Sequence, residues 1–218
     1  CVAAQGAGGD PALFVATGAS KWEWRGLGPG YASPLAIDVA GTPQIVTMTN
    51  GSVVGLDART GRELWTAPFP DDWHENIVTP VWTGTDVVVS GTRQGTHAYR
   101  LAQQGGAWRA TASWKNADVT MYMSSPVYGD GLIYGLSAKR RGQFVALDAK
   151  TGVLKWATDG REGEHASVLL LPRHIIFLSN TGALAVARRG TAAFELEKKY
   201  EGIGTAGEAW AIPAFLGA

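Results

Sequence analysis

A repeat of about 45 residues constrains the fold of this chain more than any other feature of its sequence. Pro34, Pro80 and Pro126 each follow a serine or threonine and lie 46 residues apart. The series continues at Val168 and Pro213, after 42 and 45 residues. A period of this length is typical of a β-propeller, in which each repeat forms one four-stranded blade.

A second series, of aromatic residues, has the same period. Its members are Trp22, Trp65, Trp114, Trp156 and Tyr200, with spacings of 43, 49, 42 and 44 residues. Two unrelated landmarks therefore share one period. The repeat is a property of the architecture, because side chains that recur in every unit serve packing more often than a single site.

Each repeat divides into short apolar runs separated by turn residues such as Asn50-Gly51 and Asp130-Gly131. Asn-Gly and Asp-Gly between apolar runs are typical of β-hairpins, since these residues tolerate positive φ. The sequence predicts an all-β fold, a β-propeller of four-stranded antiparallel blades. We expect four complete blades at residues 31–69, 76–116, 122–159 and 164–202, and partial blades at 1–26 and 208–218.

One eleven-residue phrase occurs twice, as GLDARTGRELW at 55–65 and ALDAKTGVLKW at 146–156. In each copy the aspartate can accept hydrogen bonds from backbone amides of a turn, and the glycine can supply a left-handed residue. The tryptophan is expected to pack against the neighbouring blade, a role that we favour over stacking on a ligand. These structural positions are Asp57, Gly61, Trp65, Asp148, Gly152 and Trp156.

The pattern Ala-x-Asp-x-x-Thr-Gly-x-x-x-Trp resembles the tryptophan-docking motif of pyrroloquinoline-quinone (PQQ) repeats, which form quinoprotein-like β-propellers. Residues 146–156 match at every position, and residues 55–65 match with glycine in place of alanine. Residues 12–22 keep Thr17, Gly18 and Trp22 but have Phe14 where the aspartate belongs. The resemblance covers nearly the whole chain and implies the propeller fold.

Family members usually have about seven or eight blades, so we expect this chain to be an arc of a larger ring whose other blades belong to the same polypeptide. The alternative is a small ring in which the two ends pair to close a fifth blade. Cys1 is either the lipidated first residue of a mature lipoprotein or an arbitrary boundary, and we favour the boundary.

Composition excludes several classes of partner and site. Lys and Arg number 19, as do Asp and Glu, so we expect neither nucleic acid nor an anionic membrane as a partner. Apolar runs are too short for a transmembrane segment. Cys1 is the only cysteine, which excludes an internal disulfide and a cysteine-based zinc site.

The resemblance to PQQ repeats does not establish that PQQ binds. In dehydrogenases of this fold the family implies a catalytic aspartate and a calcium ion beside the quinone. Asp71-Asp72 is the only adjacent acidic pair, and we interpret it as a solvated loop. We therefore predict no catalytic residue, no metal ligand and no cofactor, with PQQ and calcium required only if the chain is part of a dehydrogenase.

The loops that lead into the first strand of each blade, here called lead-in loops, repeat least and are rich in polar and aromatic side chains. In a propeller such loops gather on one face, where they carry function on a rigid scaffold. Met121 and Met123 add flexible side chains there, whereas the basic loop at 138–142 is interpreted as a solvated turn. The candidate ligand-face residues are Tyr31, Trp73, His74, Asn76, Tyr122, Ser124, Glu162 and His165.

These observations predict a non-catalytic binding or scaffolding module for a protein partner or a small ligand. A periplasmic or other bacterial envelope location is implied by the resemblance alone. The first alternative is part of a PQQ-dependent alcohol or sugar dehydrogenase. The second is a sensor or interaction domain of a larger polypeptide, such as a membrane-anchored kinase.

Overall fold

The computed structural model describes residues 2–5, 11–14, 20–26, 28, 30–73, 75–203 and 213–214, with side chains from residue 21 onward. Regular structure in this part of the chain is almost entirely β-strand, with one short 3-10 segment, η1 (Lys139–Arg141). The chain forms two compact units, residues 1–115 and 116–218.

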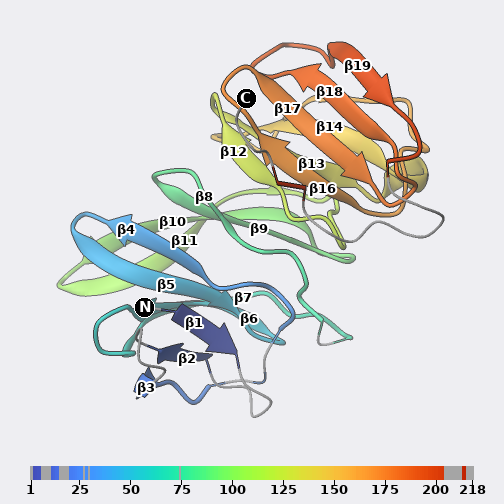
Figure 1. The fold of residues 1–218 in the computed structure, drawn as a ribbon. Coiled ribbons are helices and arrows are strands. Elements are labelled where there is room, and N and C mark those ends of the chain that lie inside the picture. The colour runs from blue at the N-terminus through green and yellow to red at the C-terminus, as the bar shows by residue number, and fades with distance from the viewer. Residues whose placement is uncertain are drawn as a thin grey trace. The chain divides into compact units, whose positions relative to one another are not determined.

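The first unit contains three antiparallel sheets in which consecutive strands are neighbours (Figure 1). The sheet nearest the N-terminus has three strands, β1 (Val2–Gln5), β2 (Pro11–Phe14) and β3 (Ser20–Glu23). The second sheet comprises β4 (Leu35–Val39), β5 (Thr42–Met48), β6 (Ser52–Asp57) and β7 (Glu63–Pro68). The third comprises β8 (Val81–Trp82), β9 (Asp86–Gly91), β10 (Gly95–Gln104) and β11 (Ala107–Asn116).

The second unit contains two four-stranded antiparallel sheets with the same neighbour order. One comprises β12 (Val127–Gly129), β13 (Leu132–Ser137), β14 (Gln143–Asp148) and β15 (Leu154–Ala157). The other comprises β16 (Ala166–Leu170), β17 (His174–Ser179), β18 (Leu184–Arg188) and β19 (Leu196–Tyr200). Four sheets of four strands, each one repeat long, confirm the all-β propeller class.

Burial explains why β9, β13 and β17, each the second strand of its sheet, contain runs of consecutive apolar residues. Every residue of β13 is buried, and the same is true of β9, the second strand of its sheet. A strand covered on both faces must be apolar on both faces, so it shows no alternation. Every residue of β19, the last strand among the described residues, is exposed. The hydrophobic cores therefore lie between successive sheets of each unit, on their inner strands.

The duplicated turn has nearly the same geometry in both copies. Asp57 Oδ1 accepts hydrogen bonds from the amides of Arg59 and Thr60 at 2.8 and 2.9 Å. Partial burial by itself would raise the pKa of Asp57, but these donors outweigh it and hold the pKa below its usual value. Asp148 accepts the equivalent bonds at 3.1 and 3.0 Å. Gly61 and Gly152 have φ of 73° and 70°, the left-handed conformation.

The two motif tryptophans lie in the cores between sheets. Trp65 shares a buried cluster with Val87 and Tyr99 of the following sheet, and Trp156 shares one with Val168 and Phe177. Trp65 also lies so close to its cross-strand neighbour Gly55 that a Cβ there would overlap the indole ring. That contact is the physical reason for glycine at the one position where this copy of the motif departs from alanine.

The indole N–H distinguishes the two tryptophans. Trp65 donates to Gln44 Oε1 at 2.7 Å, and Gln44 pairs with Asp57 across β5 and β6. In the other copy, Leu132 pairs with Asp148. Leucine offers no acceptor, and the Trp156 N–H is buried without a hydrogen-bond partner among the described residues.

The N-terminal three-stranded sheet is joined to its successor through Trp22. This indole lies over Gly61, where a Cβ would come within 2.6 Å of the ring, and its N–H donates to the Ala58 carbonyl at 3.2 Å. The tryptophan of one repeat thus packs on the turn glycine of the next. The expected partial blade at 208–218 falls outside the described residues, apart from 213–214.

Two predicted hairpin turns differ in their backbone. Asp130 and Gly131 have φ of 56° and 74°, as a mirror-image two-residue turn requires. Asn50 and Gly51 also connect two strands, but neither has positive φ. Thr49 explains the difference, since its hydroxyl oxygen accepts the Ser52 amide at 2.9 Å and so stabilises another turn.

Candidate functional site

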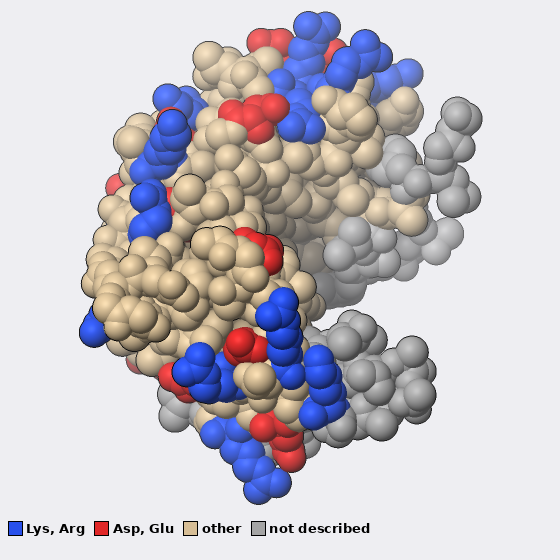
Figure 2. All heavy atoms as spheres, turned by 90° about the vertical axis from the view of Figure 1, so that its left-hand side faces the viewer, with Lys and Arg blue, Asp and Glu red and all other residues tan. Residues whose placement is uncertain are grey.

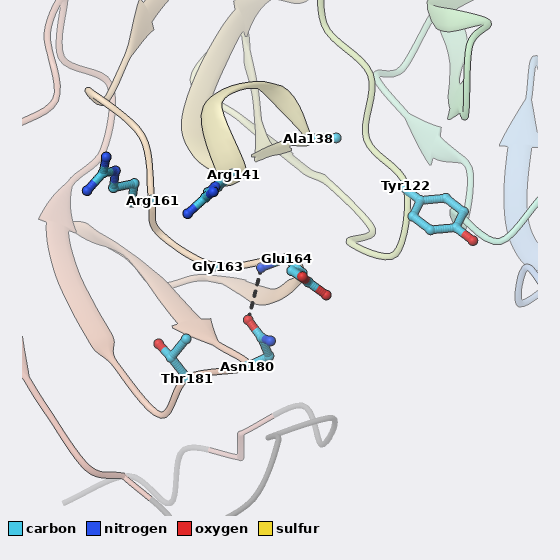
Figure 3. Close-up of a pocket in the computed structure, with 9 residues that line it drawn as sticks. Tyr122, Ala138, Arg141, Arg161, Gly163, Glu164, Asn180 and Thr181 are labelled. Carbon is cyan, nitrogen blue, oxygen red and sulfur yellow. Dashed lines mark hydrogen bonds between the residues drawn. The ribbon is translucent and has the colours of Figure 1, made fainter.

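The second unit has a hollow of about 800 Å³ where four connections between strands meet (Figure 3). Two are lead-in loops, those before β12 and β16. The other two join β13 to β14 and β17 to β18. In Figure 3 the arginines lie at one side and Tyr122 at the other, with Glu164 and Asn180 between them. The lining residues are Tyr122, Ala138, Arg141, Gly142, Arg161, Gly163, Glu164, Asn180 and Thr181.

Backbone hydrogen bonds join two of these connections into one rigid element, here called the double loop (residues 138–142 and 160–164). Three amides of the second segment donate to three carbonyls of the first. Such a ladder fixes both backbones before any ligand arrives. The bonds are Arg161 N to Arg140 O at 3.0 Å, Glu162 N to Gly142 O at 3.1 Å and Gly163 N to Arg141 O at 3.3 Å.

The backbone of the double loop is strained. Arg140, Arg141 and Arg161 have φ of 52°, 63° and 68°. The left-handed region costs a residue with a side chain about 1–2 kcal/mol, and glycine or asparagine adopts it more readily. Gly142, at φ 93°, is packed so tightly that a Cβ would lie 1.9 Å from the Gly163 carbonyl oxygen. Strain of this kind is concentrated at functional sites.

Asn180 fixes the double loop to the turn between β17 and β18. Its side-chain oxygen accepts a hydrogen bond from the Glu164 backbone N–H at 3.1 Å (dashed in Figure 3). The backbone N–H of Asn180 donates to the His165 carbonyl at 2.9 Å. The side chain is buried, with 7% exposed. These two hydrogen bonds connect the end of β17 to the loop that leads into β16, and so fix the double loop to the sheet.

Electrostatically, the hollow offers cationic groups that form no ion pair within the described chain. Lys139 pairs with Asp118 at 2.9 Å, but Arg140, Arg141 and Arg161 are exposed and make no salt bridge to a described residue. Glu164 is also exposed and unpaired there. On the face drawn in Figure 2, acidic and basic residues are interspersed and uncharged residues cover most of the surface.

The structure places the candidate residues of the second unit in different environments. Tyr122 lines the hollow, and Glu162 is half-buried in the double loop. His165 is buried. Ser124 is buried too, and its hydroxyl oxygen accepts the Ala166 amide at 2.8 Å, which joins the lead-in loop before β12 to the first residue of β16. Met121 was expected at a contact surface, but it is fully buried and packs against Gly135.

In the first unit, the candidates Tyr31 and Trp73 are exposed, at 73% and 64%, and the Arg93 guanidinium lies 6.0 Å from the Trp73 ring. Asn76 is buried, and its side-chain N–H groups donate to the Thr49 and Phe69 carbonyls at 2.7 and 3.1 Å. Asn76 therefore secures its lead-in loop from within. The remaining candidate, His74, falls outside the described residues.

Sequence reasoning missed Arg141 and Arg161, which line the hollow. The basic run at 138–142 was visible, but the neutral chain favoured a solvated turn. Lead-in loops and the connections between second and third strands meet on one face of a blade. That rule would have placed the basic run beside the candidate residues.

A site for PQQ and calcium requires several oxygen ligands close together. Calcium takes six to eight oxygen ligands, largely carboxylates. Among the described residues, no three His, Cys, Asp or Glu side chains converge as a metal site would require. Asp57 and Asp148 are engaged by turn amides, and the hollow contributes one carboxylate beside two arginines. The described residues do not fit the calcium–quinone pair.

Four-stranded sheets of one repeat each, with tryptophans docked between them, define this chain as a PQQ-repeat β-propeller. Residues 49–197 match the family described as outer membrane protein assembly factor BamB. The match spans more than half of the chain, and the chain belongs to this family.

Individual proteins with a similar sequence or structure include a BamB and other β-propellers. The BamB of Burkholderia pseudomallei (strain K96243) is 29% identical over 138 residues, which cover 62% of this chain and 32% of that protein. The chain thus spans about a third of the length of this curated relative. The β-propeller domain of Myceliophteria thermophila Cps50 (Swd1) has a TM-score of 0.62 at 11% identity, over 92% of this chain and 69% of that one.

The quinohemoprotein alcohol dehydrogenase of Comamonas testosteroni has a TM-score of 0.59 at 14% identity, over 91% of this chain and 41% of that one. At such identities a likeness shows the fold alone. In the described part of the chain, no helix has the length and apolarity needed to cross a membrane.

Proposed function

We propose that this chain is a non-catalytic protein-binding module of the bacterial envelope, and that the hollow beside the double loop is its binding surface. The observation that carries the proposal is the preorganised double loop, which holds exposed arginines in strained, hydrogen-bonded positions around a hollow of about 800 Å³. Rigid presentation of charged and aromatic side chains reduces the entropy lost on association.

Family membership supports the envelope setting. The matching family and its Burkholderia pseudomallei member are described as outer membrane protein assembly factors. We infer that this chain acts on the periplasmic side of the outer membrane, as a scaffold that contacts a protein of outer membrane assembly. Further blades belong to the same polypeptide in this proposal, because the curated relative is about three times as long as the matched segment.

The dehydrogenase alternative needs a calcium and quinone site. The solved quinohemoprotein supports the fold alone at 14% identity, and the donor groups described above do not form such a site. A protein-binding surface accounts for the unpaired arginines, whereas the alternative leaves them without a role.

Photo-crosslinking tests the proposal directly. We expect Tyr122→p-benzoylphenylalanine, expressed in the periplasm of a Gram-negative host, to give a discrete protein adduct that mass spectrometry identifies as a component of outer membrane assembly. The matched control is Leu154→p-benzoylphenylalanine, at an exposed position on β15 outside the lining of the hollow.

A discrete adduct from position 122 together with none from position 154 supports the proposal. Equal labelling from both positions, or no adduct from position 122, contradicts it, because a binding surface must label selectively.

A further inference from the structure

We propose that the hollow recognises an acidic peptide segment of the protein partner, and that Arg141 and Arg161 bind its carboxylates. This inference rests on the proposed function and specifies the chemistry of the partner. Both arginines line the hollow, one from each half of the double loop.

Arg141 and Arg161 differ from three arginines of the chain whose guanidinium groups are held by carboxylates. Arg100 binds Asp86 with 2.6 and 3.0 Å contacts, Arg188 binds Glu197 at 2.6 Å, and Arg189 binds Asp130 through two nitrogens. These guanidinium groups already have their carboxylates. Arg141 and Arg161 form no such pair with a described residue, so their donors remain available to an external one. A guanidinium fork matches a carboxylate in a bidentate geometry.

Backbone strain at Arg141 and Arg161 also supports a ligand-binding role for their side chains. Both arginines occupy left-handed positions that glycine or asparagine would adopt at lower free energy. Both residues are exposed, so burial of their side chains does not offset the strain. Ligand binding is the remaining benefit of an arginine side chain there.

The charge of the chain favours a peptide over a polyanion as the ligand. A nucleic acid or a phosphate-rich lipid surface requires an extended field of one sign, whereas this chain has a net charge of zero. Glu164 lies between the arginines and Tyr122 and would repel a continuous run of phosphates. A peptide that alternates acidic residues with neutral or basic ones fits this arrangement.

The test is a fluorescence anisotropy titration of the full chain with a short fluorescein-labelled peptide of alternating glutamate and serine. A second peptide has glutamine in place of every glutamate. The variants are Arg141→Gln, Arg161→Gln and the double substitution. Arg109→Gln, which removes one exposed arginine on β11, is the matched charge control. Thermal unfolding of each variant confirms that it is folded.

We expect each single substitution to weaken binding of the glutamate peptide by about threefold to tenfold, and the double substitution by more than about tenfold. Arg109→Gln should stay within about twofold, and the glutamine peptide should bind at least about tenfold more weakly. Affinity should fall as salt rises.

Three results would overturn the inference: unchanged affinity of a folded double variant, equal binding of both peptides, or tighter binding of oligothymidylate or inorganic phosphate than of the glutamate peptide. If position 122 still crosslinks to a protein in any of these cases, the proposed function stands and only the acidic specificity fails. If the crosslink is absent as well, both fail.

Discussion

Gly142→Ala is expected to destabilise the second unit by about 2–6 kcal/mol, measured by denaturant titration. Two effects add at this position. The residue has φ 93° and ψ 120°, a conformation that residues with a side chain rarely adopt, which costs about 1–3 kcal/mol. A Cβ would also lie 1.9 Å from the Gly163 carbonyl oxygen, so the halves of the double loop must separate, at a further cost of about 1–3 kcal/mol.

The matched control is Gly131→Ala in the turn between β12 and β13. Gly131 also has positive φ, 74°, but a Cβ there meets no atom within 4 Å. We expect a loss of about 1 kcal/mol from the backbone alone. Equal losses at the two positions would show that the contact between the halves of the double loop is not rigid.

Trp156→Ala is expected to lower the free energy of unfolding by about 3–5 kcal/mol, the range for a buried large aromatic side chain. The indole lies 5.4 Å from Phe194 and 6.1 Å from Tyr134 between ring centroids, and it joins the core between the two sheets of the second unit. Its removal leaves a cavity at the junction of those sheets. Denaturant titration followed by far-ultraviolet circular dichroism measures the change.

The variant Trp156→Phe distinguishes the contribution of the aromatic ring to stability from that of the indole N–H group. The indole N–H is buried without an acceptor among the described residues, so its loss relieves a penalty while most of the apolar contact is kept. We expect a loss of about 1 kcal/mol. A Trp156→Ala effect below about 1 kcal/mol would contradict the role of this tryptophan in joining the sheets.

The fold was predictable because its signals are local and repeated. The spacing of the small-polar-plus-proline steps and of the tryptophans sets the length of a blade. Side-chain capping at Asp57 and Asp148 depends on residues two and three positions away, which a sequence displays directly. Asn50-Gly51 shows the limit, since the preceding Thr49 selected a turn that the dipeptide alone did not indicate.

The candidate site was less predictable because it depends on which loops meet. Polar composition identified the lead-in loops but could not separate Tyr122, which lines the hollow, from Ser124, which bonds to the Ala166 amide. Arg141 belongs to a connection some 20 residues from Arg161, and only the backbone ladder between them makes one surface of the two. Such a contact requires the register of two sheets, which no local pattern encodes.

Hydrogen–deuterium exchange of the chain, free and joined to the partner captured through position 122, tests the central claim most directly. The account predicts slower exchange in peptides that cover 138–142 and 160–164, because the partner covers the double loop. Exchange in β19, which is exposed along its whole length, should be unchanged. Protection confined to β19 or to the first unit, with the double loop exchanging as in the free chain, would contradict the assignment of this hollow as the binding surface.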